Sequence, residues 1–179
     1  MKSIILTHSG YQDQEVIYPY YRLQEEGDVC LIAERVGKIR GILGTEIEAA
    51  GTYAMLFPPS DLPRASDGHL LVLPGGVKAM EKLRQDLDAL AFVKNWFELG
   101  RPLASMCSGA QLLISARVPF KGRRLAAYPA MQVDVENAGA TYVDAGVVTD
   151  GFLVSSPHYR FLSTWLREAI RIARGYVRA

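Results

Sequence analysis

The regular alternation of short apolar runs with amphipathic segments limits the fold of this chain more than any other feature. The apolar runs are typical of buried strands and cover residues 3–7, 29–34, 69–73 and 102–106. The segments that follow them have helical spacing and cover residues 16–25, 80–99, 109–116 and 159–174. Strands that alternate with helices predict an α/β three-layer sandwich, in which a mostly parallel central sheet has helices on both faces.

The remaining segments are less regular. Short extended stretches between residues 36 and 57 predict small hairpins, separated by glycines at positions 37, 41, 44 and 51. A proline-rich loop is predicted at 58–63, and two or three strands with a helix near 129–138 follow later. Pro19 is expected in the first turn of its helix, where proline is tolerated. With 179 residues and no internal repeat, the chain fits a single domain over 1–179.

Composition and charge argue against several classes of partner. The formal net charge is +1, so no strong field would attract nucleic acid or an acidic membrane. The basic cluster at 121–124 contains no aromatic residue and is typical of a solvated turn. Near the N-terminus only three strongly apolar residues are consecutive, too few for a signal peptide or a membrane span. We therefore expect a cytoplasmic protein.

The two cysteines stand in different surroundings, and they are too few for a disulfide framework. Cys30 lies inside an apolar strand and is interpreted as a packing residue. Cys107 follows an apolar strand and comes directly before Ser108 and Gly109, where a short helix is expected. A strand, a turn of small residues and a helix form a nucleophile elbow, here with cysteine as the nucleophile.

This elbow predicts a reactive thiol. Free backbone amides at the start of a helix favour negative charge, so we expect a lowered pKa for Cys107. The same amides could hold an oxyanion, and Gly109 would let the helix pack closely against the strand. The alternative is a structural cysteine buried at the end of a strand.

A second junction is expected at the same edge of the sheet, because carboxyl ends of parallel strands meet there. Gly75 and Gly76 end one strand, and their amides could complete an oxyanion site or merely form a loop. Glu15, near the start of the first helix, would face the same crevice. A carboxyl beside a thiolate would be protonated and donate a hydrogen bond to sulfur. Otherwise Glu15 is a helix N-terminal charge favoured by the dipole.

Four stretches together resemble the ThiJ/PfpI superfamily, most closely its PfpI-like branch of intracellular cysteine peptidase-like proteins. They cover residues 12–27, 71–76, 100–107 and 137–144. The resemblance implies the flavodoxin-like, class I glutamine amidotransferase-like fold. It also implies that Cys107 is the nucleophile and that Glu15 is the carboxyl facing it. A homodimer or a ring of dimers is implied as well, with the first helix or the region of Met80 at the interface.

The resemblance extends to two further positions. Glu81 stands near the place of an acidic residue that reaches a neighbouring subunit's site in PfpI-like oligomers, although the spacing is one residue longer here. Its alternative is a solvated helix charge. Tyr128 matches a family segment that lines the pocket, and its alternative is an aromatic residue in the core.

One departure from the family changes the expected chemistry. Where PfpI-like proteases have histidine after the cysteine, this chain has Ser108, which cannot accept a proton near neutral pH. The departure argues against classical peptidase activity. His158 could supply a different polar group, or it is a surface histidine at a helix start. His8 is a similar candidate, whereas His69 begins a strand and is expected to be structural.

These observations favour a cysteine-dependent hydrolase or lyase acting on a small carbonyl, amide or isonitrile-like substrate. Hydratase and glyoxalase- or deglycase-like reactions fall within this class. Cys107 would attack, the amides of Gly76 and Ser108 would hold the developing charge, and Glu15 would carry a proton. The alternatives are a redox-sensing or stress-response protein with an oxidisable Cys107, or a binding module. No metal or cofactor is implied, because metal-ligand spacing and a phosphate-binding loop are both missing from the sequence.

Overall fold

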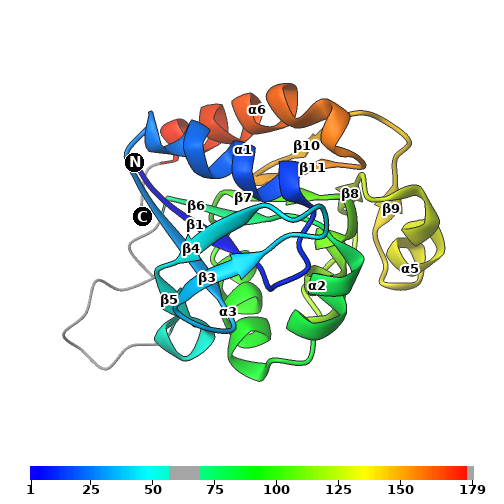
Figure 1. Cartoon of the computed structure of the whole chain (residues 1–179). Coiled ribbons are helices and arrows are strands. Elements are labelled where there is room, and N and C mark those ends of the chain that lie inside the picture. The colour runs from blue at the N-terminus through cyan, green and yellow to red at the C-terminus, as the bar shows by residue number, and fades with distance from the viewer. Residues whose placement is uncertain (57–68, 177–179) are drawn as a thin grey trace.

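The computed structural model describes residues 1–56 and 69–176, so the loop expected at 58–63 lies outside the described residues. Its centre is a seven-stranded sheet with the order β10-β11-β7-β6-β1-β2-β5. All neighbouring strands of this sheet are parallel except β10 and β11 (Figure 1). The strands are β1 (Lys2–Leu6), β2 (Asp28–Ala33), β5 (Gly51–Thr52), β6 (Leu70–Leu73), β7 (Leu103–Met106), β10 (Val148–Asp150) and β11 (Leu153–Ser156).

Helices cover both faces of this sheet, which confirms the predicted three-layer α/β architecture (Figure 1). One face carries α1 (Asp13–Gln24) and α6 (Leu162–Gly175), which contact each other. The other carries α2 (Val77–Leu83), α3 (Leu87–Glu98) and α4 (Ala110–Ser115). The strands between these layers are apolar and buried, because a parallel sheet covered on both sides has no face in water.

The smaller elements lie at the margins of the sheet. They are the hairpin β3 (Gly37–Arg40) and β4 (Glu46–Ala49), the pair β8 (Arg124–Leu125) and β9 (Thr141–Tyr142), the helix α5 (Gln132–Asn137), and the 3-10 turns Tyr53–Leu56, Cys107–Gly109, Pro129–Met131 and Tyr159–Phe161. The hairpin confirms the glycine-punctuated prediction. Its connecting loop is fixed by Asp13, whose carboxylate accepts backbone hydrogen bonds from Leu43 at 2.8 Å and Thr45 at 2.9 Å.

Two helix predictions are wrong in their boundaries. The long helix expected over 80–99 is two helices, because Asp86 caps α3 by accepting a hydrogen bond from the amide of Ala89 at 2.8 Å. The first helix starts at Asp13, which places Pro19 in its interior rather than in its first turn. Apolar spacing alone gives no account of either difference, since both depend on backbone hydrogen bonds at helix ends.

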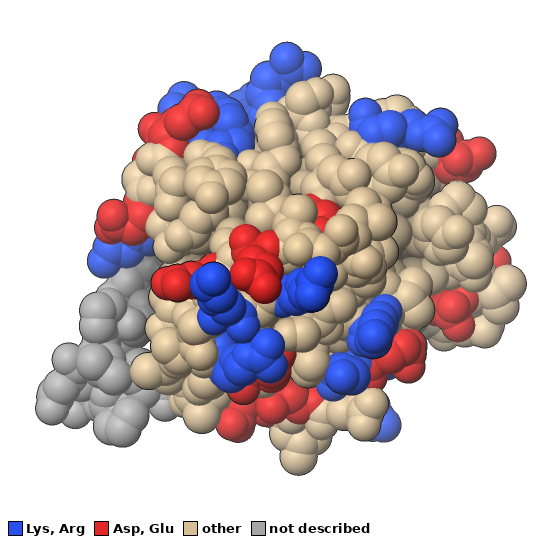
Figure 2. All heavy atoms as spheres, in the orientation of Figure 1, with Lys and Arg blue, Asp and Glu red and all other residues tan. Residues whose placement is uncertain are grey.

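The register of the central strands brings their carboxyl ends to one edge. Leu73 of β6 pairs with Ser105 of β7, and Met106 of β7 pairs with Ser156 of β11. The segments that follow these three strands therefore start side by side. In the part of the chain that the structure describes, no helix is long and apolar enough to cross a membrane. Acidic and basic side chains are mixed over the face seen in Figure 2.

Candidate active site

Cys107 stands on a strained turn between β7 and α4. Its φ is 54°, a left-handed backbone conformation that few residues other than glycine adopt. The preceding Met106 is extended, and Cys107 opens the 3-10 turn that runs into α4. Strain of this kind persists where the surrounding structure fixes it, and it is concentrated at functional sites. The predicted elbow is therefore present in the backbone.

Two glycines allow the backbone to close around this turn. A Cβ on Gly109 would lie 2.3 Å from the carbonyl oxygen of Leu73, so only glycine lets the turn pack on the end of β6. A Cβ on Gly75 would lie 2.8 Å from Cys107 Cβ and 2.5 Å from Glu15 Oε2. The second contact shows that the two junctions and the first helix converge, as the sequence predicted.

Glu15 is completely buried and faces the cysteine. It is the third residue of α1, and its Oε2 accepts a hydrogen bond from the amide of Gly75 at 2.6 Å. Burial raises the pKa of Glu15 to about 7, although hydrogen bonds from the Gly75 amide and the Cys107 thiol oppose that shift. Near neutral pH the carboxyl is therefore close to half protonated. The expected hydrogen bond from a protonated carboxyl to a thiolate is wrong, because the thiol keeps its own proton.

The expectation of a lowered thiol pKa is wrong. Burial, followed by the negative charge of Glu15, raises the pKa of Cys107 to about 12. The amide and hydroxyl of Ser108 lower the thiol pKa, as predicted for the start of a helix, but their effect is smaller than that of burial. Near neutral pH the sulfur therefore keeps its proton beside the Glu15 carboxyl.

The oxyanion donors differ in part from the prediction. The amide of Gly75 is engaged by Glu15 and is not free to bind a substrate oxygen. Gly76 has a φ of 105°, and a Cβ there would lie 2.5 Å from the amide nitrogen of Gln12. Its glycine identity is therefore fixed by the turn. Ser108 is buried beside the sulfur, and its Oγ has no hydrogen-bond partner of standard geometry among the described residues.

Tyr128 lies next to the elbow through its backbone, and His158 follows the neighbouring strand. The amide of Tyr128 donates to the carbonyl oxygen of Cys107 at 3.2 Å, and 41% of the tyrosine is exposed, so it is not a core residue. His158 follows β11, which pairs with β7. Its Nδ1 accepts a hydrogen bond from the amide of Arg160 at 3.2 Å, and burial with the charge of Arg160 lowers its pKa. Neutral His158 is thus a helix cap.

Three other sequence candidates have local partners. Glu81 is exposed on α2 and forms an ion pair of 3.2 Å with Arg84, as expected for a solvated helix charge. His8 lies 3.6 Å from a carboxylate oxygen of Glu34. The Nδ1 of His69 accepts a hydrogen bond from the amide of Lys2 at 3.2 Å, in keeping with a structural role.

Gln12 and Gln111 flank the site and were not predicted from the sequence. Each has a buried side-chain oxygen without a hydrogen-bond partner in the part of the chain that the structure describes. Gln12 directly precedes α1 with an extended backbone, and no sequence pattern pointed to its side chain. Gln111 stands four residues after Cys107. Within residues 1–56 and 69–176, no group of three or more histidine, cysteine, aspartate or glutamate side chains could hold a metal.

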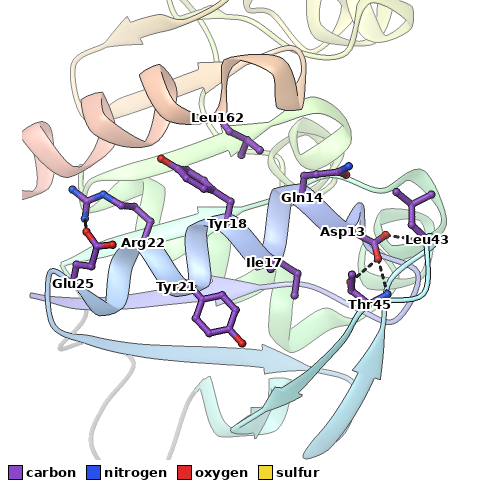
Figure 3. A pocket seen from close by; sticks show the side chains of 10 residues that line it. All are labelled: Asp13, Gln14, Ile17, Tyr18, Tyr21, Arg22, Glu25, Leu43, Thr45 and Leu162. Carbon is purple, nitrogen blue, oxygen red and sulfur yellow. Dashed lines mark hydrogen bonds and ion pairs between the residues drawn. The ribbon is translucent and has the colours of Figure 1, made fainter.

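A groove of about 660 Å³ lies on the outer face of α1, and neither Cys107 nor Glu15 lines it. Figure 3 shows Tyr18 and Tyr21 of α1 in this groove, with Leu162 of α6 and Leu43 of the hairpin at its borders. Arg22 and Glu25 form an ion pair of 3.3 Å at one end. The groove is mostly apolar and has none of the strained backbone found at Cys107.

Comparison with known proteins assigns the family. A model described as the DJ-1/PfpI family matches residues 1–172. Deglycase TK1284 of Thermococcus kodakarensis is 41% identical over 175 residues, covering 97% of this chain and 100% of that protein. Protein/nucleic acid deglycase 2 of Escherichia coli is 33% identical over 173 residues, covering 96% of each. The chain belongs to the DJ-1/PfpI family, which confirms the resemblance.

A solved structure supports the same assignment. It is a two-domain protein from Anabaena variabilis with DJ-1/ThiJ/PfpI-like and ferritin-like domains. It matches with a TM-score of 0.86 and 30% identity, over 98% of this chain and 48% of that chain. Because a shared fold hosts many activities, the reaction has to be argued from the site.

Proposed function

We propose that this protein is a cysteine-dependent hydrolase that removes small carbonyl-derived groups from amines. One observation carries the proposal: Cys107, on its strained turn, and the buried carboxyl of Glu15 converge on Gly75, where a Cβ would lie 2.8 Å from Cys107 Cβ and 2.5 Å from Glu15 Oε2. In nucleophile and base pairs of this kind, the group beside the nucleophile accepts its proton as it attacks the substrate, and Glu15 is placed to do this for Cys107. Relatives named deglycases, from an archaeon and from a bacterium, support the same class of substrate.

The pair can supply both protons that such a reaction needs. As the sulfur of Cys107 bonds to the substrate's carbonyl carbon, the thiol proton passes to Glu15 and the carbonyl electron pair moves onto oxygen. The amides of Gly76 and Ser108 are the donors that we assign to this oxyanion. When the oxyanion collapses and the carbon–nitrogen bond breaks, Glu15 returns the proton to the leaving nitrogen. Water then hydrolyses the thioester that an amide substrate leaves, and this restores the thiol.

With a hemiaminal adduct, the sulfur bonds to the carbinol carbon as its carbon–nitrogen bond breaks, and the thiol proton passes through Glu15 to the leaving nitrogen. The hemithioacetal then releases its aldehyde as the thiol is restored.

Ser108 fits this scheme without a histidine. Its hydroxyl and amide both favour negative charge on the neighbouring sulfur, so they stabilise the thiolate that forms during attack. Ser108 takes no proton itself. The base is Glu15, whose pKa of about 7 suits proton transfer near neutral pH.

The proposal is tested by following the free amine released from the glyoxal adduct of Nα-acetyl-lysine and from simple amides, and the formamide produced from isonitriles. We expect Cys107→Ala to lose at least about 100-fold in kcat/KM, because the nucleophile is gone. Cys30→Ser is the matched control, since its thiol lies in β2 and its pKa is raised by burial alone. Full turnover by Cys107→Ala on any substrate in this panel would refute the proposal.

The redox-sensing alternative fits the site less well. Oxidation of cysteine starts from the thiolate, and the raised pKa of Cys107 keeps that form scarce in the resting protein. Intact mass after mild peroxide treatment distinguishes the two functions. A sensor would add oxygen selectively at Cys107, whereas the hydrolase is expected to react no faster there than an ordinary protein thiol.

A further inference from the structure

The first turn of α1 is held from outside the helix. Gln12, the residue before the helix, makes no side-chain capping hydrogen bond. The first amides of a helix have no partners within it, so an uncapped start has to be held by other segments. Asp13, the first residue of α1, extends its carboxylate onto the loop between β3 and β4 (Figure 3). Glu15, the proposed base, belongs to the same turn.

The buried carboxylate of Asp13 is the centre of this contact. One oxygen accepts from the amide of Leu43 at 2.8 Å, and the other accepts from the amide of Thr45 at 2.9 Å and from its hydroxyl at 2.5 Å. Burial raises the pKa of Asp13, but the hydrogen bonds from Thr45 and Leu43 together lower it further, so the group is charged at neutral pH. A Cβ on Gly41 would lie 2.5 Å from Asp13 Cγ, so only glycine lets the loop come this close.

Three further hydrogen bonds join the same two segments. They run from Gly10 N to Arg40 O at 2.8 Å, from Ile42 N to Tyr11 O at 3.0 Å, and from the Tyr11 hydroxyl to Thr45 O at 3.0 Å. Together with the bonds of Asp13, they hold residues 10–13 against residues 40–45. We call this set of contacts the α1 anchor.

The anchored turn also contacts the junction that follows β6. The amide of Gln12 donates to the carbonyl oxygen of Gly75 at 3.2 Å, and the amide of Glu15 donates to the carbonyl oxygen of Gln12 at 3.0 Å. Glu15 Oε2 accepts from the amide of Gly75 at 2.6 Å. A Cβ on Gly75 would lie within 3 Å of both Glu15 Oε2 and Cys107 Cβ. The place of Glu15 beside the cysteine therefore depends on where the turn begins.

We infer that Asp13 is a positioning residue, which holds the start of α1 so that the carboxyl of Glu15 lies beside Cys107. The inference rests on the proposed function, in which Glu15 exchanges a proton with the thiol. Asp13 is not among the causes of the Glu15 pKa shift, and Cys107 is the only titratable group among them in the described residues. Asp13 thus acts through the placement of the helix rather than through its charge.

The pH profile of Cys107 alkylation by iodoacetamide tests this placement without turnover, by mass spectrometry of the Cys107 peptide. As the sulfur–carbon bond forms, iodide leaves with the electrons of the carbon–iodine bond, and Glu15 accepts the thiol proton. In Asp13→Asn an acceptor oxygen becomes a donor that faces donating amides, so the loop separates from the turn. Water then reaches Glu15. Because burial is the largest cause of its raised pKa, the midpoint near 7 should fall by at least about one pH unit.

Thr45 provides a milder variant, which decides the matter if Asp13→Asn does not fold. Thr45→Val removes one of the three hydrogen bonds that Asp13 accepts, and the midpoint should fall by about 0.3–0.5 pH unit. Thr45→Ser keeps the hydroxyl and should match the native protein. Glu46→Gln is the charge control, because Glu46 is exposed on the same hairpin and pairs with Lys38. Urea midpoints show which variants are folded.

A midpoint that equals the native value, or exceeds it, in folded Asp13→Asn or in Thr45→Val would overturn the inference. An equal fall in Glu46→Gln would overturn it as well, because the cause would then be the charge of the hairpin.

The proposed function fails in a different way. In that case the native protein releases no amine from any substrate, while the alkylation midpoints of the native protein and Asp13→Asn still differ. Where amine is released, we expect Asp13→Asn to lose about 10- to 100-fold in kcat with KM nearly unchanged, as for a misplaced catalytic group. A native kcat in this variant would contradict the positioning role alone.

Discussion

Glu15 is a buried acid, and no cationic side chain of residues 1–56 and 69–176 is among the causes of its pKa shift. Desolvation is the largest cause of its raised pKa, and only hydrogen bonds from Gly75 and Cys107 oppose it. The protein therefore retains an acid that is easily protonated at a position where a neutral side chain would be more stable. Such a cost is typical of functional sites, where pKa values are matched to proton transfer rather than to stability.

The raised pKa of Glu15 makes stability depend on pH. Its folded pKa, about 7, exceeds the ordinary value of 4.5, so the folded state binds the proton more tightly. This contribution to stability is complete below about pH 4.5 and is lost as pH rises to about 7. In Glu15→Gln the dependence disappears. We expect the variant to gain roughly 2 kcal/mol over the native protein between about pH 5 and pH 8.

Urea unfolding of both proteins at the two pH values measures this difference. Asp88→Asn is a suitable control, because Asp88 is an exposed acid in the first turn of α3. A stability difference between Glu15→Gln and the native protein that stays constant with pH would mean that the carboxyl titrates normally.

At the scale of single residues, the sequence predicts which residues form the site better than it predicts their pKa values. Cys107 and Glu15 were found from their places at strand and helix ends, and Gly109 from its place after the cysteine. The direction in which the Cys107 pKa shifts was not predictable, because it depends on whether burial has a larger effect than the nearby amide dipoles. Gln12 and Gln111 were missed, because an unpartnered oxygen is a property of the packed structure.

Among the elements, the contact between the elbow and β6 determines where the sulfur lies. Gly109 has an ordinary helical φ of −55°, so alanine would meet no backbone strain there. The obstacle is steric, since its Cβ would lie 2.3 Å from the carbonyl oxygen of Leu73. Because this neighbour is backbone of a central strand, the turn rather than the strand has to move.

We therefore expect Gly109→Ala to destabilise the protein by about 1–3 kcal/mol, as overpacking of a core does. It should also slow amine release, because the displaced turn moves Cys107 away from Glu15. Gly175→Ala is the control, since a Cβ on Gly175 at the end of α6 has no neighbour within 4 Å. Urea midpoints together with kcat/KM check both effects. Native stability and activity in Gly109→Ala would show that the close packing is not needed.

For the whole molecule, the alternation of strands and helices was sufficient to predict the layers and the parallel sheet. It could not predict the strand order, or that the chain between residues 80 and 99 forms two helices, because Asp86 acts through a local cap. The site lies where three neighbouring strands end, so an architecture predicted from periodicity already indicates where chemistry is possible.

The homodimer that the resemblance implies stays a prediction. Of the two regions suggested for its interface, Met80 is completely buried within the protomer. The first helix instead presents exposed aromatic residues, with Tyr21 61% exposed in the groove of Figure 3. The exposed aromatic residues of α1 are therefore one place to look for self-association.

The central claim is that Cys107 and Glu15 share a proton, and the pH profile of Cys107 alkylation tests it most directly. In the native protein the iodoacetamide rate should rise with an apparent pKa near 7, as Glu15 becomes able to accept the thiol proton. In Glu15→Gln that rise should vanish. A native profile that rises only near the ordinary thiol pKa of 9.0, and is unchanged in Glu15→Gln, would contradict the account.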